Sequence, residues 1–177
     1  GQFVAHDITA DRSSIRHQVD PTELRNARSP QLNLECLYGD GPVGHPSLFR
    51  RDDPAKLLLG RDGADVLRNE EGTAIIGDPR NDSHLFVSQM HLAFARAHNA
   101  FVDRARATGV EEARVSEHAA RELRWHYQSV VQPHLSGSCR CGTLFLQAKI
   151  RDPPPRHPSC YFEEAKKNLL VARLFPN

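Results

Sequence analysis

The sequence predicts a mainly α-helical domain with long irregular loops, and three observations support this class. Apolar residues recur at helical spacing through two long stretches between residues 82 and 131. The segment before them is rich in Pro, Gly, Asp and Arg and shows little sustained periodicity. A chain of 177 residues is long enough to bury a core as one domain. We therefore expect helices that carry long connecting loops.

The first element in the chain is a helix end. Phe3, Val4 and Ile8 stand near helical spacing within residues 1–8, and the turn-like residues 9–14 follow. The chain starts without Met in what looks like the middle of an amphipathic helix, which predicts a piece of a longer domain. Residues 21–25 and 54–59 are short helical candidates in the loop region that continues to Asp82.

Two long helices follow the loop region. Asp82 or Ser83 can cap the first, which runs to about Ala107. Its apolar stripe consists of Phe86, Val87, Met90, Phe94, Ala97, Phe101 and Val102. Thr108 and Glu111 have capping-box spacing for the second, which is expected to end before Pro133. Its stripe consists of Val115, Ala119, Leu123, Tyr127, Val130 and Val131.

These two helices are predicted to pack as an antiparallel hairpin that buries Phe94, Phe101, Leu123 and Tyr127. Residues 1–135 then form the helical part of the chain, and residues 136–177 form a divergent tail. The tail contains a Ser-Gly-Ser-Cys-Arg-Cys-Gly stretch, a run of three prolines and a short helical candidate at residues 161–174.

Overall charge excludes several classes of partner. With 23 Lys and Arg against 22 Asp and Glu, the net charge is +1, which favours neither nucleic acid nor an anionic membrane. No apolar run approaches the roughly 20 residues of a membrane span, and none resembles a signal peptide. We expect a soluble protein; the sequence does not fix its compartment, and secretion stays open.

Four patterns could carry chemistry, and each also has a plain structural explanation. Gln2 and His6 are four residues apart and share a helix face, which suits acid–base chemistry but also a polar helix terminus. Arg80 follows Pro79 near a helix start, where it could bind an anion or pair with Asp78 or Asp82 on the surface.

The third pattern is an alternation of oxygen-bearing and apolar side chains from Ser29 to Glu35. Leu32 and Leu34 would point inward. The oxygen-bearing side chains would share the other side: Ser29, Gln31, Asn33 and Glu35. Calcium takes six to eight oxygen ligands, so a cation loop is one interpretation, and a half-buried edge strand is the other. His91 and His98 are seven apart and suit either metal binding or hydrogen-bonded core positions.

Taken together and in order, these segments resemble the animal-type haem peroxidases, especially bacterial members. The resemblance lies in residues 1–9 (GQFVAHDIT), 34–42 (LECLYGDGP), 77–82 (GDPRND), 89–94 (QMHLAF) and 96–99 (RAHN). It covers residues 1 to about 131, which correspond to the distal half of a family domain.

The resemblance implies roles for individual residues. His6 matches the distal histidine that moves a proton between the two peroxide oxygens, and Gln2 matches an amide that lines the same pocket. Arg80 matches the arginine that stabilises charge as the O–O bond breaks. Asp7 matches a calcium ligand, and the remaining calcium loop falls on Ser29, Gln31 through its carbonyl, Asn33 and Glu35.

Several departures from the family limit this implication. Ala5 and Ser83 stand where mammalian members form haem esters, so haem b would bind without covalent bonds. Asn33 and Glu35 are not the usual calcium-loop residues. No counterpart of the proximal histidine follows residues 125–131, and His134 and His157 lie in or near the divergent tail. Because that axial ligand positions the iron, we expect weak haem binding and slow peroxide turnover by this chain alone.

The function that the resemblance implies is reduction of hydrogen peroxide with oxidation of a small-molecule donor, as in oxidative-stress defence. A second hypothesis is fatty-acid dioxygenation, which other members of this family perform, although no suitable downstream Tyr and apolar channel is evident. A third hypothesis is that the chain is a truncated product that binds neither haem nor peroxide, and the divergent tail favours it.

Overall fold

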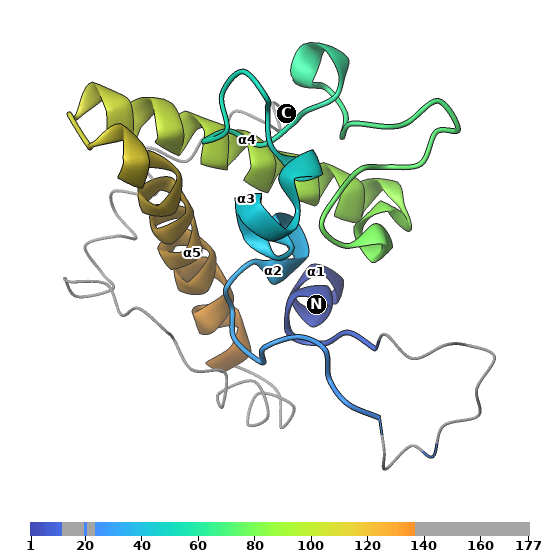
Figure 1. The fold of residues 1–177 in the computed structure, drawn as a ribbon. Helices are drawn as coiled ribbons and strands as arrows, with labels where there is room; N and C mark the ends of the chain where they lie inside the picture. Colours follow the sequence, from blue (N-terminus) through green and yellow to red (C-terminus); the bar gives the residue numbers. More distant parts are fainter. Residues whose placement is uncertain (12–19, 21–23, 137–177) are drawn as a thin grey trace, which may run out of the picture.

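The computed structural model describes residues 1–11, 20 and 24–136, and Figure 1 shows their arrangement. In chain order the elements are α1 (Gln2–Ile8), α2 (Glu35–Tyr38), α3 (Gly41–Gly44), η1 (Pro46–Leu48), η2 (Arg61–Gly63), η3 (Pro79–Asp82), α4 (Leu85–Ala107) and α5 (Glu112–Ser136). Among these residues, β pairing is limited to isolated bridges between Phe49 and Leu57 and between Arg68 and Ala74. The predicted mainly helical class is confirmed.

The predicted hairpin of two long helices is confirmed. Figure 1 shows α4 and α5 meeting at the short turn that follows Ala107, with α1 to α3 gathered between them. Leu123 and Tyr127 are each 2% exposed. Phe94 and Phe101 are partly buried and pack against the same core. No helix in the described ranges is long and apolar enough to cross a membrane.

The predicted start of α4 is wrong by a few residues. Asp82 ends η3 and pairs with Arg68 at 2.7 Å, so α4 starts at Leu85 after His84, without a side-chain cap. The apolar stripe is also wrong at its beginning, because Phe86 and Met90 are 82% and 46% exposed.

The predicted boundaries of α5 are wrong at both ends. The Thr108 hydroxyl donates to the carbonyls of Arg104 and Ala105 and so terminates α4 instead of capping α5. The helix continues past Pro133 to Ser136. A proline in the last turns removes one backbone donor, which a helix tolerates better near its end than in its middle.

The candidate helix at residues 54–59 is not formed. Its backbone pairs in tertiary contacts instead, because the Asn99 side chain of α4 accepts from the Leu57 amide at 2.8 Å and donates to its carbonyl at 3.0 Å. Leu24 and Arg25 are not helical either, and the rest of the candidate at 21–25 lies outside the described residues. The candidate at 161–174 also lies outside them.

An aromatic cluster fixes α1 between the two long helices. The Phe3 ring stacks on Phe94 with centroids 5.1 Å apart, and Tyr127 stands edge-on to Phe3 at 6.1 Å and to Phe94 at 5.5 Å. Edge-on and offset-stacked pairs are the favoured aromatic geometries. Residues on the next turn of α1 therefore have defined positions, which determines where Gln2 and His6 lie.

Candidate active site

Helix α1 has two faces with different environments. Phe3 and Asp7, four residues apart, lie in the core and are 3% and 0% exposed. Gln2 and His6 share the adjacent face, on which His6 contacts η3 and Gln2 contacts the residues between η3 and α4. The predicted common face of Gln2 and His6 is thus present, and the core contacts of Phe3 orient it.

His6 belongs to a buried chain of side-chain hydrogen bonds. Its Nδ1 lies 2.8 Å from Oδ1 of Asn81, and Nδ2 of Asn81 lies 3.1 Å from Nδ1 of His91. All three side chains are buried, and Asn81 is fully enclosed. Since Nδ1 of His6 is taken, Nε2 is the ring nitrogen that has no hydrogen-bond partner among the described residues.

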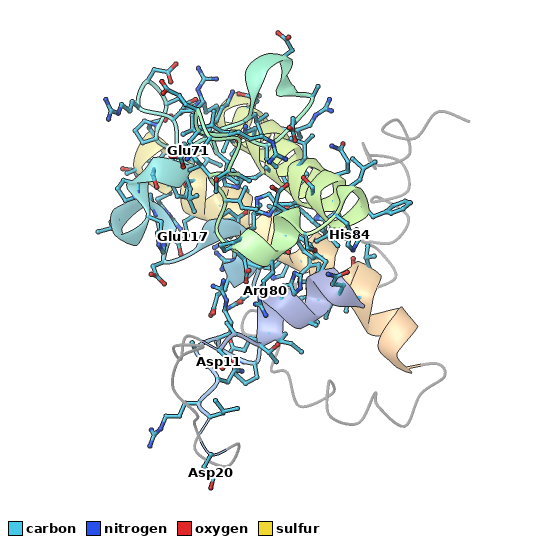
Figure 2. The ribbon with its side chains drawn as sticks, turned by 90° about the vertical axis from the view of Figure 1, so that its right-hand side faces the viewer. Asp11, Asp20, Glu71, Arg80, His84 and Glu117 are labelled. Atoms are coloured by element: carbon cyan, nitrogen blue, oxygen red, sulfur yellow. The ribbon has the colours of Figure 1, made fainter. Side chains whose placement is uncertain are left out.

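Gln2 is held by the residues that follow Asn81. Its Nε2 donates to the Ser83 hydroxyl at 3.2 Å, and its Oε1 lies 2.7 Å from Nε2 of His84. The segment from Arg80 to His84 therefore runs along α1 in the opposite direction. Figure 2 shows this, with His84 near the beginning of α1 and Arg80 near its end.

Arg80 approaches the backbone of His6 and not its ring. Its Nη2 donates to the carbonyls of His6 at 3.1 Å and Thr9 at 2.6 Å. The guanidinium also pairs with the Asp78 carboxylate at 2.7 Å, and this hydrogen bond raises the pKa of Arg80. The sequence indicated pairing with Asp78 or Asp82 as the structural alternative for Arg80, and the pair with Asp78 is present. The role that the resemblance implies for Arg80 requires its guanidinium to act on the same ligand as the His6 ring, and the side chain does not lie that way here.

Asp78 links Arg80 to a second arginine, Arg28, which no sequence pattern singled out. Arg28 pairs with Asp78 at 3.1 Å, and both side chains are almost fully buried. Arg28 also donates to the Glu35 carbonyl at 3.1 Å. This pair ties the loop before α2 to the segment that carries Asn81. No local pattern marks Arg28, since its partner is 50 positions away.

The alternation from Ser29 to Glu35 is present, although it does not form a strand. Leu32 and Leu34 are buried, and the intervening polar residues are partly exposed. Leu34 has a φ of 61°, in the left-handed region, and α2 starts directly after it. The Glu35 carboxylate accepts from the Ser29 amide at 3.2 Å and from the Asn33 side chain at 2.8 Å.

Asp7 holds this loop against α1. Its carboxylate accepts from the amides of Leu34 at 3.2 Å and Cys36 at 3.4 Å. Burial raises the pKa of Asp7 to about 6, and these two amides oppose the shift. Within the described ranges, no group of three or more His, Cys, Asp or Glu side chains is arranged to hold a metal ion. Calcium binding therefore remains an expectation from the resemblance.

His91 and His98 occupy hydrogen-bonded core positions, as one of their two readings predicted. His98 lies between the Tyr38 hydroxyl at 3.0 Å and the Ala55 carbonyl at 2.9 Å. Burial lowers the pKa of both histidines to about 4, so both are neutral at neutral pH. They face different partners and do not form a shared metal site.

Apolar surface flanks the Gln2 face. Leu85 and Phe86, which follow His84, are 71% and 82% exposed, and the rings of His84 and Phe86 are 6.5 Å apart. A separate cavity of about 530 Å³ lies between the loop around Glu35 and α5, where Arg124, Trp125 and Gln128 line it. It does not include Gln2, His6 or Arg80.

The short helix α1, which carries Gln2 and His6, packs against the long hairpin of α4 and α5 in a mainly helical fold that solved structures share. The chain matches the solved fatty acid alpha-dioxygenase of Arabidopsis thaliana with 22% identity and a TM-score of 0.61. It matches the enzyme of Oryza sativa with 19% identity and a TM-score of 0.58. Each match covers 73% of this chain, but only 25% and 26% of the respective enzymes.

At these identities the likeness establishes the fold alone, and the chain spans about a quarter of the length of the two enzymes. No protein-family model and no curated protein sequence matches the chain.

Proposed function

We propose that this chain forms the distal side of a haem-dependent peroxidase, which reduces hydrogen peroxide and oxidises a small-molecule donor. The observation that carries the proposal is the hydrogen bond from His6 to Asn81, which leaves Nε2 of His6 as the acid–base nitrogen. A histidine fixed through one ring nitrogen is the usual arrangement of a general acid–base group.

In this proposal His6 moves the proton. Nε2 accepts a proton from one oxygen of bound peroxide and delivers it to the other oxygen, which leaves as water. Such positioned transfer is worth roughly 100-fold to 10,000-fold in rate. Gln2 lies on the same face of α1 and would orient the peroxide through its amide. Haem b would supply the electrons for reduction when bound.

The residues around Gln2 fit one face of a porphyrin. Leu85 and Phe86 offer exposed apolar surface beside the polar atoms of Gln2 and His84. Ala5 and Ser83 form no ester, and Ser83 accepts a hydrogen bond from Gln2, so haem would be held without covalent bonds. His91 and His98 are committed to core hydrogen bonds, so we assign neither of them as a proximal haem ligand.

Arg80 has an electrostatic role in this proposal only after a rearrangement. To stabilise charge on a peroxide oxygen, its guanidinium would exchange the carbonyls of His6 and Thr9 for the ligand. Its pairing with Asp78 keeps the cation beside α1 in either arrangement.

A second candidate function is oxygenation of a fatty acid, and the two structural matches favour it. Both solved enzymes are named as fatty acid alpha-dioxygenases. The two candidates differ in their co-substrate, since a dioxygenase consumes oxygen with a fatty acid and a peroxidase consumes peroxide with a donor. Oxygen uptake on addition of a fatty acid, without peroxide, would favour the dioxygenase.

Haem titration of the full chain, followed by absorption spectroscopy, tests the binding part of the proposal. We expect a saturable Soret band that weakens when Phe86→Asp places a charge on the apolar face, with Val43→Asp, 94% exposed elsewhere, as the matched control. A band abolished by His134→Ala or His157→Ala, but not by His6→Ala, would identify the axial ligand. No saturable band would contradict the proposal and favour an inactive fragment.

A further inference from the structure

The polarity of the buried chain His6–Asn81–His91 determines which nitrogen of His6 carries the proton. Asn81 presents its oxygen to Nδ1 of His6 and its amide nitrogen to Nδ1 of His91. An amide oxygen only accepts and an amide nitrogen only donates. Nδ1 of His6 must therefore bear a hydrogen, and Nδ1 of His91 must carry a lone pair.

We propose that Asn81 and His91 are positioning residues that hold neutral His6 in its Nδ1–H form, so that Nε2 presents a lone pair. This inference rests on the proposed function for its catalytic meaning, but the protonation pattern itself does not require haem. When Nε2 takes a proton from an O–H group, Nδ1–H keeps its bond to Asn81. His6 then passes between its neutral and its protonated form without rearrangement of Asn81 and His91.

The environment of Asn81 and His91 supports this polarity. His91 is 4% exposed, and burial lowers its pKa to about 4, opposed by Asp78 and Asp82, so its ring stays neutral and can accept at Nδ1. The Cys36 thiol also interacts with Asn81, and burial raises the pKa of that thiol, so it is uncharged. The Asn81 amide nitrogen thus faces a neutral imidazole that can accept its hydrogen bond, and the two ends of the amide are distinguished by the hydrogen bonds that they make.

These three hydrogen-bonded side chains also connect helices that are distant in sequence. His6 comes from α1, Asn81 from η3 and His91 from the second turn of α4. The segment that carries Asn81 is in turn held by Asp78, which bonds Arg28 and Arg80. Residues that orient metal-bound histidines typically change metal affinity or activity by roughly 10-fold to 100-fold when they are removed, and we expect an effect of similar size for the residues that orient His6.

Long-range ¹H–¹⁵N correlation spectra of the full chain labelled at histidine test the proposal without turnover. His6→Gln assigns the His6 signals. In the unaltered chain at neutral pH, we expect His6 to show a protonated Nδ1 and an unprotonated Nε2. The reverse pattern would mean that the Asn81 amide faces the other way, and it would overturn the proposal.

Substitutions then test the two supporting residues separately. Asn81→Leu should shift His6 toward the Nε2–H form, which free histidine favours, and Asn81→Asp should keep Nδ1–H because it retains an acceptor. His91→Leu should leave His6 with both forms populated. The control is His98→Gln, because His98 is a buried histidine that takes no part in the hydrogen bonds between His6, Asn81 and His91. This substitution should change nothing at His6. An Nδ1–H pattern that survives Asn81→Leu would contradict the proposal.

Activity of the haem-loaded chain separates this inference from the proposed function. If peroxide turnover occurs, Asn81→Leu should lower its rate by roughly 10-fold to 100-fold, and Asn81→Asp should lower it less. If His6 shows the expected protonation pattern but the chain does not turn over peroxide, the positioning role stands and the proposed function is wrong. If peroxide turnover is unaffected by Asn81→Leu, the proposed function stands and the positioning role is wrong.

Discussion

The side chains of His6 and Asn81 are joined by a 2.8 Å hydrogen bond between positions 75 residues apart. This bond brings a helix at the beginning of the chain to the segment that starts the long helical hairpin. The geometry depends on two anchors, which are the Phe3 aromatic cluster on one side of α1 and the Asp78 ion pairs on the other. Each anchor can be tested by its own substitution.

Phe3→Ala should strongly destabilise the fold. The Phe3 side chain is 3% exposed and contacts both Phe94 and Tyr127, so its removal leaves a cavity between α1 and both long helices. A buried Phe→Ala change typically costs about 3–5 kcal/mol of unfolding free energy. Phe86→Ala is the matched control, and at 82% exposure it should change stability by less than about 0.5 kcal/mol. Urea unfolding measures both, and equal effects would refute the assigned core.

Asp78→Asn should cost more than removal of a surface carboxylate. It leaves Arg28 buried without a counter-charge, and breaking such a buried pair typically costs about 3–5 kcal/mol. The control is Asp52→Asn, which removes the partner of Arg50 at the exposed surface and should change stability far less. Comparable unfolding midpoints for the two variants would show that Arg28 and Asp78 are not buried together.

His98 should make the fold sensitive to acid. Burial lowers the pKa of His98 to about 4, against an ordinary value of 6.5 in the unfolded chain. Between these values the unfolded chain binds more protons, so the stabilising contribution is complete above pH 6.5 and is lost as pH falls toward 4. The loss approaches roughly 3 kcal/mol for this residue.

The acid effect is measured by urea unfolding at pH 7 and at pH 4.5. His98→Gln should reduce the difference between the two pH values, because glutamine does not titrate. His91 has the same shift and keeps part of the difference in the variant. An unchanged pH dependence in His98→Gln would show that His98 is not buried as described.

The periodic parts of the fold could be predicted from the sequence, since burial against one core imposes the helical spacing that the sequence displays. Leu123 and Tyr127 are examples. Boundaries depended on competing hydrogen bonds. The Thr108 hydroxyl bonds the last carbonyls of α4 instead of capping α5, and the Asn99 side chain bonds the backbone of Leu57 from 42 positions away. Residue spacing carries no information about a pairing as distant as the second.

The candidate site was predictable in part for the same reason. Gln2 and His6 share a face because both lie on one helix, and helix geometry alone determines this. Asn81, Arg28 and the partner choice of Arg80 depend on contacts across 50 to 75 positions, which local patterns do not encode. Nothing in the sequence distinguished an Arg80 that faces a ligand from one that binds backbone carbonyls.

Peroxide-dependent donor oxidation by the haem-saturated full chain, corrected for haem alone, tests the role of His6 most directly. Turnover should be slow, because no proximal haem ligand is identified among the described residues. His6→Gln should still lower the rate by at least about 100-fold, since it removes the acid–base nitrogen. His45→Gln, which alters a partly exposed histidine beside Asp40, is the control and should retain the rate. Equal rates in His6→Gln and the unaltered chain would contradict the account.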